Sequence, residues 1–155
     1  TLRTSSAASD VYKRQIIWQK SKGANANFAW GSWLSASNPV IRDLHEYCLI
    51  FSKESLNRNK DGESTIDKEE FMDSTLSIWN ILPAKAKKVG HPAPFPEELV
   101  DRFINLYSYK KELILDPFMG SGTTALAAIN SDRKYVGYEV NKEYCELAAI
   151  RIKDR

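Results

Sequence analysis

The residues best suited to chemistry in this sequence form a glycine-containing loop, Asp116-Pro117-Phe118-Met119-Gly120-Ser121-Gly122-Thr123-Thr124. An apolar strand is predicted immediately before the loop, at Leu113 to Leu115, and a helix from Gly122 to Asn130 after it. Glycines let the backbone turn sharply and approach a ligand closely, while the free N–H groups of a helix N-terminus attract anions. The loop is therefore a candidate cofactor-binding site.

The residues of this loop, taken alone, fit more than one ligand. Gly120 to Ala125 satisfies the dinucleotide fingerprint G-x-G-x-x-A, and Glu139 supplies the acidic residue that binds a ribose in such enzymes. A Walker phosphate loop is excluded, because Thr123 follows Gly122 where that loop needs lysine. A nicotinamide-dependent oxidoreductase (NAD as cofactor) therefore remains an alternative, and so does a purely structural turn.

The elements around the loop predict a βαβα unit. Its parts are a buried strand at Leu113 to Leu115, the helix that ends at Asn130, a strand at Tyr135 to Tyr138 and a closing helix at Glu143 to Ile150. Connected in this way, the two strands should be parallel with a right-handed crossover. The loop then lies at the carboxyl edge of the sheet, where open α/β sheets bind ligands.

Two further helices are predicted upstream of this unit. Glu97 to Tyr107 has its apolar residues at helical spacing, which indicates an amphipathic helix. Asp67 followed by Glu70 is typical of a capping box, and predicts a helix through about Ile78. The apolar residues expected on the buried face of this capped helix are Phe71, Leu76, Ile78 and Trp79.

The N-terminal third of the chain contains two β-branched and aromatic runs, which predict strands at Ile16 to Gln19 and Tyr47 to Phe51. The connection between them is too long for a tight hairpin. It carries the aromatic residues Phe28, Trp30 and Trp33.

Together with its neighbours, the glycine loop resembles a known motif. D-P-F-x-G-S-G-T-T, at Asp116 to Thr124, is similar to motif I of the DNA methyltransferases that modify exocyclic amino groups. His91 to Leu99 resembles motif X of that family, and Tyr135 to Glu139 resembles motif II. Ile16 to Lys20 and His45 to Lys53 are similar to the strands that follow the catalytic motif. The resemblance covers nearly everything after residue 15, and implies an α/β, Rossmann-like methyltransferase fold with S-adenosyl-L-methionine as cofactor.

The resemblance also implies roles for individual residues. Asp116 and Phe118 would contact the methionine end and the sulfonium neighbourhood of the cofactor, and Glu139 would accept hydrogen bonds from the ribose hydroxyls. The cofactor carboxylate would lie near the N–H groups at the start of the helix. The implied cofactor-binding residues are His91, Pro92, Phe95, Asp116, Pro117, Phe118, Gly120, Ser121, Gly122, Thr123, Thr124 and Glu139.

The catalytic tetrapeptide of the family, D-P-P-Y or S-P-P-Y, does not occur in this sequence. In members with a permuted motif order it precedes the cofactor motifs, and would lie before Ile16. We therefore assign no catalytic residue, expect no turnover from this chain alone, and expect an incomplete sheet with an exposed edge. Methylation of an amino nitrogen needs no covalent intermediate, so Cys48 and Cys145 are interpreted as core residues.

The permuted order divides the chain into four regions. Residues 1–15, small and polar, are expected to be a tail that is either not native to the domain or disordered. Residues 16–53 belong to the catalytic domain, 54–90 correspond to target recognition, and 91–155 form the cofactor-binding unit. The basic residues of the recognition region that could meet DNA phosphates are Arg58, Lys60, Lys85, Lys87 and Lys88.

The resemblance implies double-stranded DNA as the substrate, methylated at cytosine N4 or adenine N6. The aromatic residues Phe28, Trp30 and Trp33 of the long connection either touch this DNA or pack against the sheet. The partner expected in a restriction–modification system is a cognate restriction endonuclease. A catalytically dead DNA-binding module is the alternative that is not an enzyme.

Composition sets few further limits. The net charge of +2 is compatible with a nucleic-acid partner but too small to argue for one. No apolar run reaches the roughly 18 residues of a membrane span, so we expect a cytoplasmic protein without a membrane partner. Asn57 to Lys68 begins like a calcium-binding loop but ends in lysine where glutamate is needed, so no metal is expected.

Overall fold

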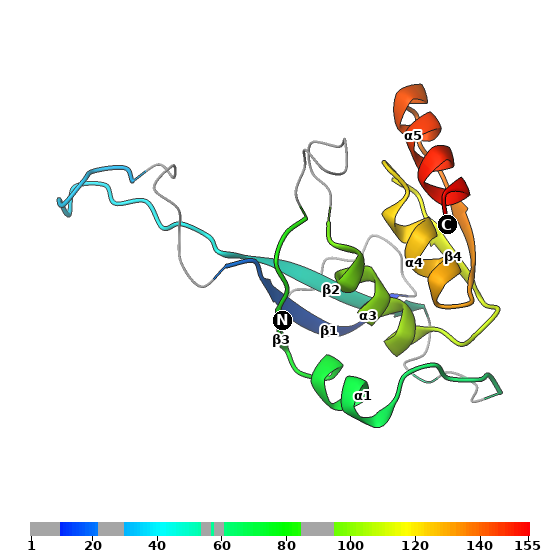
Figure 1. Cartoon of the computed structure of the whole chain (residues 1–155). Coiled ribbons are helices and arrows are strands. Elements are labelled where there is room, and N and C mark those ends of the chain that lie inside the picture. Colours follow the sequence, from blue (N-terminus) through cyan, green and yellow to red (C-terminus); the bar gives the residue numbers. More distant parts are fainter. Residues whose placement is uncertain (1–9, 22–29, 54–56, 58–60, 85–94) are drawn as a thin grey trace. The chain divides into compact units, whose positions relative to one another are not determined.

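The computed structural model describes residues 10–21, 30–53, 57, 61–84 and 95–155 and is drawn in Figure 1. Its helices and strands are, in chain order, β1 (Asp10–Gln19), β2 (His45–Lys53), α1 (Lys68–Ser74), β3 (Ile78–Asn80), α3 (Glu97–Tyr107), β4 (Leu113–Asp116), α4 (Thr123–Asn130), β5 (Lys134–Gly137) and α5 (Lys142–Lys153). They fall into two compact units, residues 1–58 with 76–82 and residues 59–75 with 83–155.

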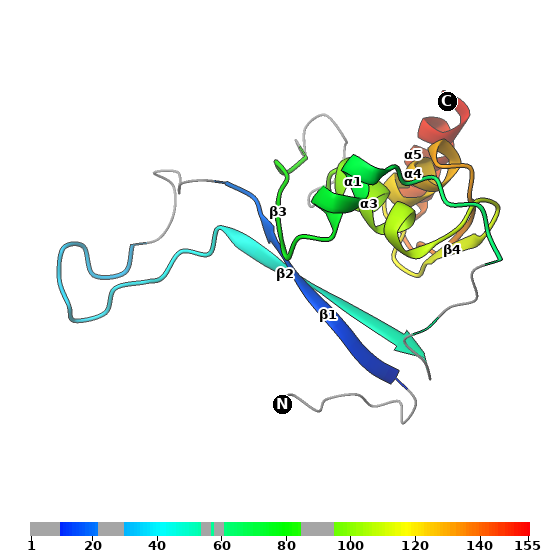
Figure 2. The same cartoon turned by 90° about the horizontal axis from the view of Figure 1, so that it is seen from below.

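The first unit is built on a three-stranded sheet in the order β2-β1-β3. β1 pairs antiparallel with β2, with one irregularity between Tyr12 and Arg14, and Figure 2 shows the twisted ribbon that results. β3 pairs parallel with β1, which places Trp79 opposite Trp18. The indole N–H of the buried Trp18 donates to the carbonyl of Ile81 at 2.8 Å, so this side chain also holds the segment that follows β3.

β1 is longer than the sequence predicted. It begins at Asp10 rather than at Ile16, so residues 10–15 are not disordered; residues 1–9 lie outside the described part of the chain. Asp10 to Gln15 pair with β2. That strand supplies the backbone hydrogen bonds of this segment, a contribution that the composition of the segment alone could not reveal.

The helix that follows the predicted capping box, in contrast, is shorter than expected. Asp67 does cap it, because its side chain accepts a hydrogen bond from the Glu70 backbone N–H at 2.8 Å. The helix ends at Ser74, however, and Ile78 to Asn80 form β3, where the ladder with β1 replaces helical hydrogen bonds. Of the apolar residues expected on the buried helix face, Trp79 is buried within β3, whereas Phe71, Leu76 and Ile78 are exposed.

The second unit contains the predicted βαβα arrangement. β4 and β5 are parallel neighbours, and Figure 1 shows α4 beside β4. The core where α3 and α4 meet the sheet consists of Ile104, Ala127 and Ala128, with Val100, Ile114 and Tyr135 packed against it. The alanines of α4 let the helix approach closely, because they present no long side chains to the sheet.

β4 is not the buried strand that its apolar sequence predicted. Leu113 and Leu115 are 61% and 60% exposed, whereas Ile114 and Asp116 are half-buried. Alternate side chains of a strand point to opposite faces, and α4 packs on the face that carries Ile114. Among the described residues β4 pairs with β5 alone, and the side chains on its opposite face, Leu113 and Leu115, are exposed.

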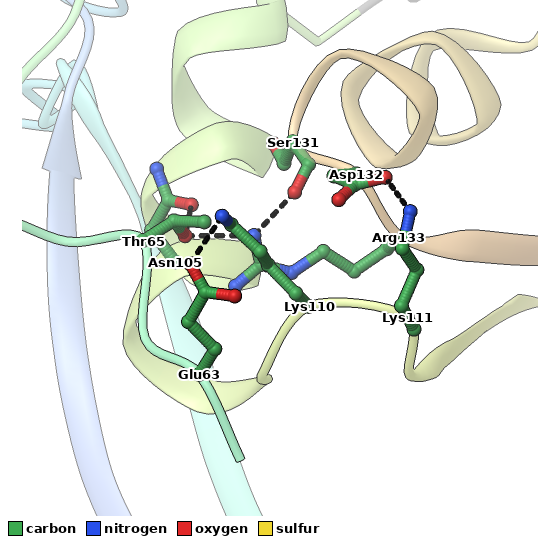
Figure 3. Close-up of polar contacts among 8 residues, drawn as sticks. All are labelled: Glu63, Thr65, Asn105, Lys110, Lys111, Ser131, Asp132 and Arg133. Carbon is green, nitrogen blue, oxygen red and sulfur yellow. Dashed lines mark hydrogen bonds and ion pairs between the residues drawn. The ribbon is translucent and has the colours of Figure 1, made fainter.

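Arg133 is a buried cation that connects three segments of the second unit (Figure 3). Its guanidinium donates to the Ser108 hydroxyl at 3.1 Å and to the Ser108 carbonyl at 2.7 Å, at the end of α3. It also donates to the Thr65 hydroxyl at 2.7 Å and to the Ser131 carbonyl. Burial lowers the pKa of this guanidinium from its ordinary value. The arginine thus fixes the segment ahead of α1 against the end of α3 and the start of β5.

The polar contacts continue outward from Thr65. Its hydroxyl donates to the Asn105 side-chain oxygen at 2.8 Å, and the Asn105 amide donates to Glu70 of α1 at 2.9 Å. Ion pairs join Lys110 to Glu63 and Lys111 to Asp132 at the surface of the same cluster. These surface pairs contribute little by themselves, so the buried arginine is the residue on which the cluster depends.

We expect Arg133→Met to destabilise the second unit by about 2–4 kcal/mol, because it leaves the oxygens of Thr65, Ser108 and Ser131 without their donor. Urea unfolding followed by circular dichroism would measure the change. The matched control is Lys134→Met, at the exposed neighbouring position, which should change the free energy of unfolding by less than about 0.5 kcal/mol. Equal effects of the two substitutions would contradict this account of the cluster.

The stability of the second unit should also depend on Asp101 of α3. Burial raises the pKa of this carboxyl to about 6 from its ordinary 3.8, Glu97 adds to the shift, and Arg155 opposes it. Because the folded form binds the proton more tightly, this group favours folding fully below pH 3.8, and the benefit is lost as pH rises through about 6. At pH 7.5 we therefore expect Asp101→Asn to stabilise the chain, by about 1 kcal/mol or less after solvent screening.

Thermal unfolding at pH 4.5 and pH 7.5 would test this effect of Asp101. The asparagine variant should lose less stability than the wild type over that interval. If the wild type and Asp101→Asn lose the same stability between pH 4.5 and pH 7.5, Asp101 does not contribute to the pH dependence.

Candidate cofactor-binding site

The loop between β4 and α4 is closed by the carboxylate of Asp116, the last residue of β4. One oxygen accepts a hydrogen bond from the Phe118 backbone N–H at 2.9 Å, and the other accepts from the Thr124 hydroxyl at 2.5 Å. The first contact is a local turn that aspartate favours. The second ties the end of the strand to the first turn of the helix, so one side chain sets the span of the loop.

Two glycines give the loop its path. Gly120 has φ of 52° and Gly122 has φ of 83°, a left-handed conformation that other residues adopt only with strain. A Cβ atom on Gly122 would also lie 3.0 Å from the Cβ of Ala148 in α5. The Gly122 N–H donates to the Met119 carbonyl at 3.0 Å, which completes the turn. Both the conformation and the close approach of α5 therefore require glycine at position 122.

Glu139 meets the loop from the end of β5. One of its carboxylate oxygens accepts from the Gly120 N–H at 2.8 Å, and the other accepts from the Asn141 N–H at 2.8 Å. The backbone of Tyr138 extends the connection, because its N–H donates to Asp116 and its carbonyl accepts from Met119. The structure thus brings Glu139 and the glycine loop together at the carboxyl edge of the parallel strands, as the βαβα pattern predicted.

Arg151 of α5 is a residue of this site that the sequence did not reveal. Its Nη1 atom donates to the Ser121 carbonyl at 2.5 Å and to the Ser121 hydroxyl at 2.9 Å, with the Thr123 hydroxyl at 3.5 Å. Burial lowers the pKa of this guanidinium from its ordinary value, and Glu97 opposes that effect. No local motif marks Arg151; the only available signal was its place in the helix that closes the βαβα unit.

The residues around the loop differ widely in exposure. Ser121, Thr123 and Thr124 are buried, whereas Phe118 is 85% exposed and is not a core residue. Phe95 is half-buried, one residue before the buried Pro96 that caps α3. Other predicted contact residues lie outside the described part of the chain, namely Phe28, Arg58, Lys60, Lys85, Lys87, Lys88, His91 and Pro92.

The two cysteines are half-buried rather than fully enclosed in a core. The Cys145 thiol lies 3.5 Å from the Glu139 carbonyl. Burial raises the pKa of the Cys48 thiol, which disfavours the reactive thiolate.

The aromatic residues of the long connection that are described, Trp30 and Trp33, contact each other edge to face at 4.8 Å. The Arg42 guanidinium lies 3.4 Å from the centre of the Trp30 ring, and Trp33 is 62% exposed. Trp33 therefore does not pack fully against the sheet.

Within the described ranges, no group of three or more side chains is arranged to hold a metal ion. The helices in this part of the chain are also too short or too polar to cross a membrane.

Residues 7–150 match the model of a protein family described as DNA methylase. This match spans nearly the whole sequence, and the chain belongs to that family. The type II methyltransferase M.MthZI of Methanothermobacter thermautotrophicus is 33% identical over 152 residues, which cover 90% of this chain and 42% of the relative. The orphan methyltransferase M.BamHII of Bacillus amyloliquefaciens is 50% identical over 85 residues, which cover 51% of this chain and 32% of the relative. The chain thus spans less than half the length of these curated relatives.

Solved structures show the same fold. TTHA0409 of Thermus thermophilus, complexed with S-adenosyl-L-methionine, has a TM-score of 0.75 and 28% identity, over 94% of this chain and 54% of that one. The M1.HpyAVI–SAM complex has a TM-score of 0.63 and 27% identity, over 92% and 62% of the two chains. These comparisons confirm the prediction of an α/β, Rossmann-like methyltransferase fold.

We expect Gly122→Ala to destabilise the second unit by about 1–3 kcal/mol, because alanine at this position combines a left-handed backbone with a close contact to α5. Urea unfolding would measure the loss. Gly122→Ala should cost less in an Ala148→Gly background, which lacks the facing methyl, and the comparison is made with Ala148→Gly alone because glycine inside a helix is itself destabilising. If Gly122→Ala unfolds at the wild-type urea concentration, the strained turn is not needed for stability.

Proposed function

We propose that this chain forms the cofactor-binding part of an S-adenosyl-L-methionine-dependent DNA methyltransferase that transfers methyl to an exocyclic amino group. The observation that carries the proposal is the closed loop from Asp116 to Thr124, held by Glu139 at the carboxyl edge of parallel strands, in a member of the DNA methylase family. Cytosine N4 is the preferred target in this proposal, because the segments present resemble the S-P-P-Y branch, and adenine N6 is the alternative.

The residues of the loop fit this cofactor. Asp116 accepts one hydrogen bond within the protein on each carboxylate oxygen, which shapes the loop and leaves acceptor capacity for the methionine end of the cofactor. Glu139 accepts a backbone hydrogen bond on each oxygen, and because a carboxylate oxygen can accept more than one, a ribose hydroxyl can share it. The exposed Phe118 offers an apolar surface to the ligand. When bound, the cofactor supplies an electrophilic methyl group on its sulfonium.

Other residues complete the proposed cofactor site. Pro117 stiffens the exit from β4, and the start of α4 faces the cofactor carboxylate with its free N–H groups. His91, Pro92 and Phe95 are the residues that the resemblance to motif X implies for the methionine side of the cofactor. The residues that line the turn itself are Gly120, Ser121, Gly122, Thr123 and Thr124.

The substrate in this proposal is double-stranded DNA. The target base must leave the helix and present its amino nitrogen to the methyl group, which is the task of the D/S-P-P-Y tetrapeptide that this sequence lacks. The chain alone is therefore proposed to bind cofactor without turnover. We also propose residues 54–90 for target recognition, Trp33 for DNA contact, a cytoplasmic location, and a cognate restriction endonuclease as partner.

Isothermal titration calorimetry of this 155-residue chain with S-adenosyl-L-methionine and with NAD tests the proposal. We expect S-adenosyl-L-methionine to bind at least about tenfold more tightly, which is about 1.4 kcal/mol. Glu139→Ala should weaken S-adenosyl-L-methionine binding about tenfold or more, because the variant loses both the ribose acceptor and the hydrogen bond to Gly120. Glu146→Ala, an exposed glutamate of α5, serves as the control and should bind as the wild type does. Tighter binding of NAD would replace the methyltransferase proposal with an oxidoreductase.

A further inference from the structure

We propose that Arg151 is a positioning residue of α5 that holds the middle of the cofactor loop and places its positive charge where the cofactor carboxylate binds. The inference rests on the proposed function, because it concerns the same site. The guanidinium reaches Ser121 at 2.5 Å to the carbonyl and 2.9 Å to the hydroxyl, and it approaches the Thr123 hydroxyl at 3.5 Å. Ser121 is 4% exposed, so these contacts are made inside the protein.

The contacts matter because of where Ser121 lies in the loop. Asp116 holds Phe118 and Thr124, and Glu139 holds Gly120. Neither carboxylate reaches Ser121, which lies between the two left-handed glycines, where the backbone has the greatest freedom. Arg151 is the side chain that fixes this middle segment.

α5 presents two residues to the loop from one face. Ala148 lies three residues before Arg151, a spacing that puts both side chains on the same side of a helix, and Ala148 is the residue that meets Gly122. Figure 1 shows α5 next to α4. The helix thus supports the loop in two places: the small side chain of Ala148 meets Gly122, and the long side chain of Arg151 binds Ser121.

The electrostatic setting of Arg151 indicates a role beyond stabilising the fold. Burial disfavours its charged form, and a cation near the N-terminus of α4 meets the positive end of the helix dipole. Among the described residues its hydrogen bonds go to neutral oxygens of the loop. The charge therefore adds to the field that attracts an anionic group to the start of α4, where the proposed function places the cofactor carboxylate.

Arg151→Gln and Arg151→Lys test the inference, with Lys153→Gln as a control that removes the same charge from an exposed position of α5. Calorimetry would give the Kd of each variant for S-adenosyl-L-methionine and for 5′-methylthioadenosine, which lacks the amino-acid part. Arg151→Gln should raise the Kd for S-adenosyl-L-methionine about tenfold or more, and the Kd for methylthioadenosine less than about threefold. Arg151→Lys, which keeps the charge but not the planar fork, should fall between Arg151→Gln and the wild type, and Lys153→Gln should bind as the wild type does.

Several outcomes would overturn the inference. One is a Kd of Arg151→Gln for S-adenosyl-L-methionine within about twofold of the wild-type value. Another is an equal rise in Kd for S-adenosyl-L-methionine and methylthioadenosine, which a general loosening of the fold would cause. If circular dichroism shows that Arg151→Gln is unfolded, Arg151→Lys decides, and a wild-type Kd for S-adenosyl-L-methionine then overturns the inference. If the wild type itself fails to bind S-adenosyl-L-methionine, the proposed function falls and this inference falls with it, a result distinct from the loss of the inference alone.

Discussion

The carboxylate of Asp116 is the contact on which the site depends. It is the last residue of β4, and its two oxygens hold the N–H of Phe118 and the hydroxyl of Thr124. A strand end and a helix start are thereby kept at a fixed separation, and the turn between them uses the left-handed Gly120 and Gly122. The parallel pairing of β4 with β5 then brings Glu139 to the Gly120 N–H. The loop is therefore held by the protein's own groups before any ligand arrives, a pre-organisation that lowers the cost of binding.

The second unit uses two arginines to connect its segments. Arg133 and Arg151 both reach inward, and both donate to hydroxyls and carbonyls in the contacts that define their clusters. Neutral acceptors do not compensate the positive charge in these contacts, which is costly for a group withdrawn from water. The planar fork, however, can satisfy several oxygens at once. In each cluster the arginine connects segments that are far apart in sequence, a role for which a shorter polar side chain lacks the reach.

The parts of the structure that could be predicted from sequence are those fixed by local signals. The glycine loop, the amphipathic helix from Glu97 to Tyr107 and the Asp67 cap each depend on residues a few positions apart. The errors fell where a distant partner decides the conformation. Asp10 to Gln15 and Ile78 to Asn80 become strands because β1 and its neighbours pair across long stretches of chain. Arg151 was missed for the same reason, since its partners Ser121 and Thr123 belong to another element.

The path of the chain through its two units also constrains how the protein can fold. Residues 1–58 begin the first unit, residues 59–75 belong to the second, and residues 76–82 return to complete the first. β3 can therefore join β1 only after the polypeptide has closed a long loop that includes α1, and loop closure carries an entropic cost. Such non-local pairing slows folding. No single cut in the chain separates the two units, so neither can be encoded by one continuous stretch of the gene without including part of the other.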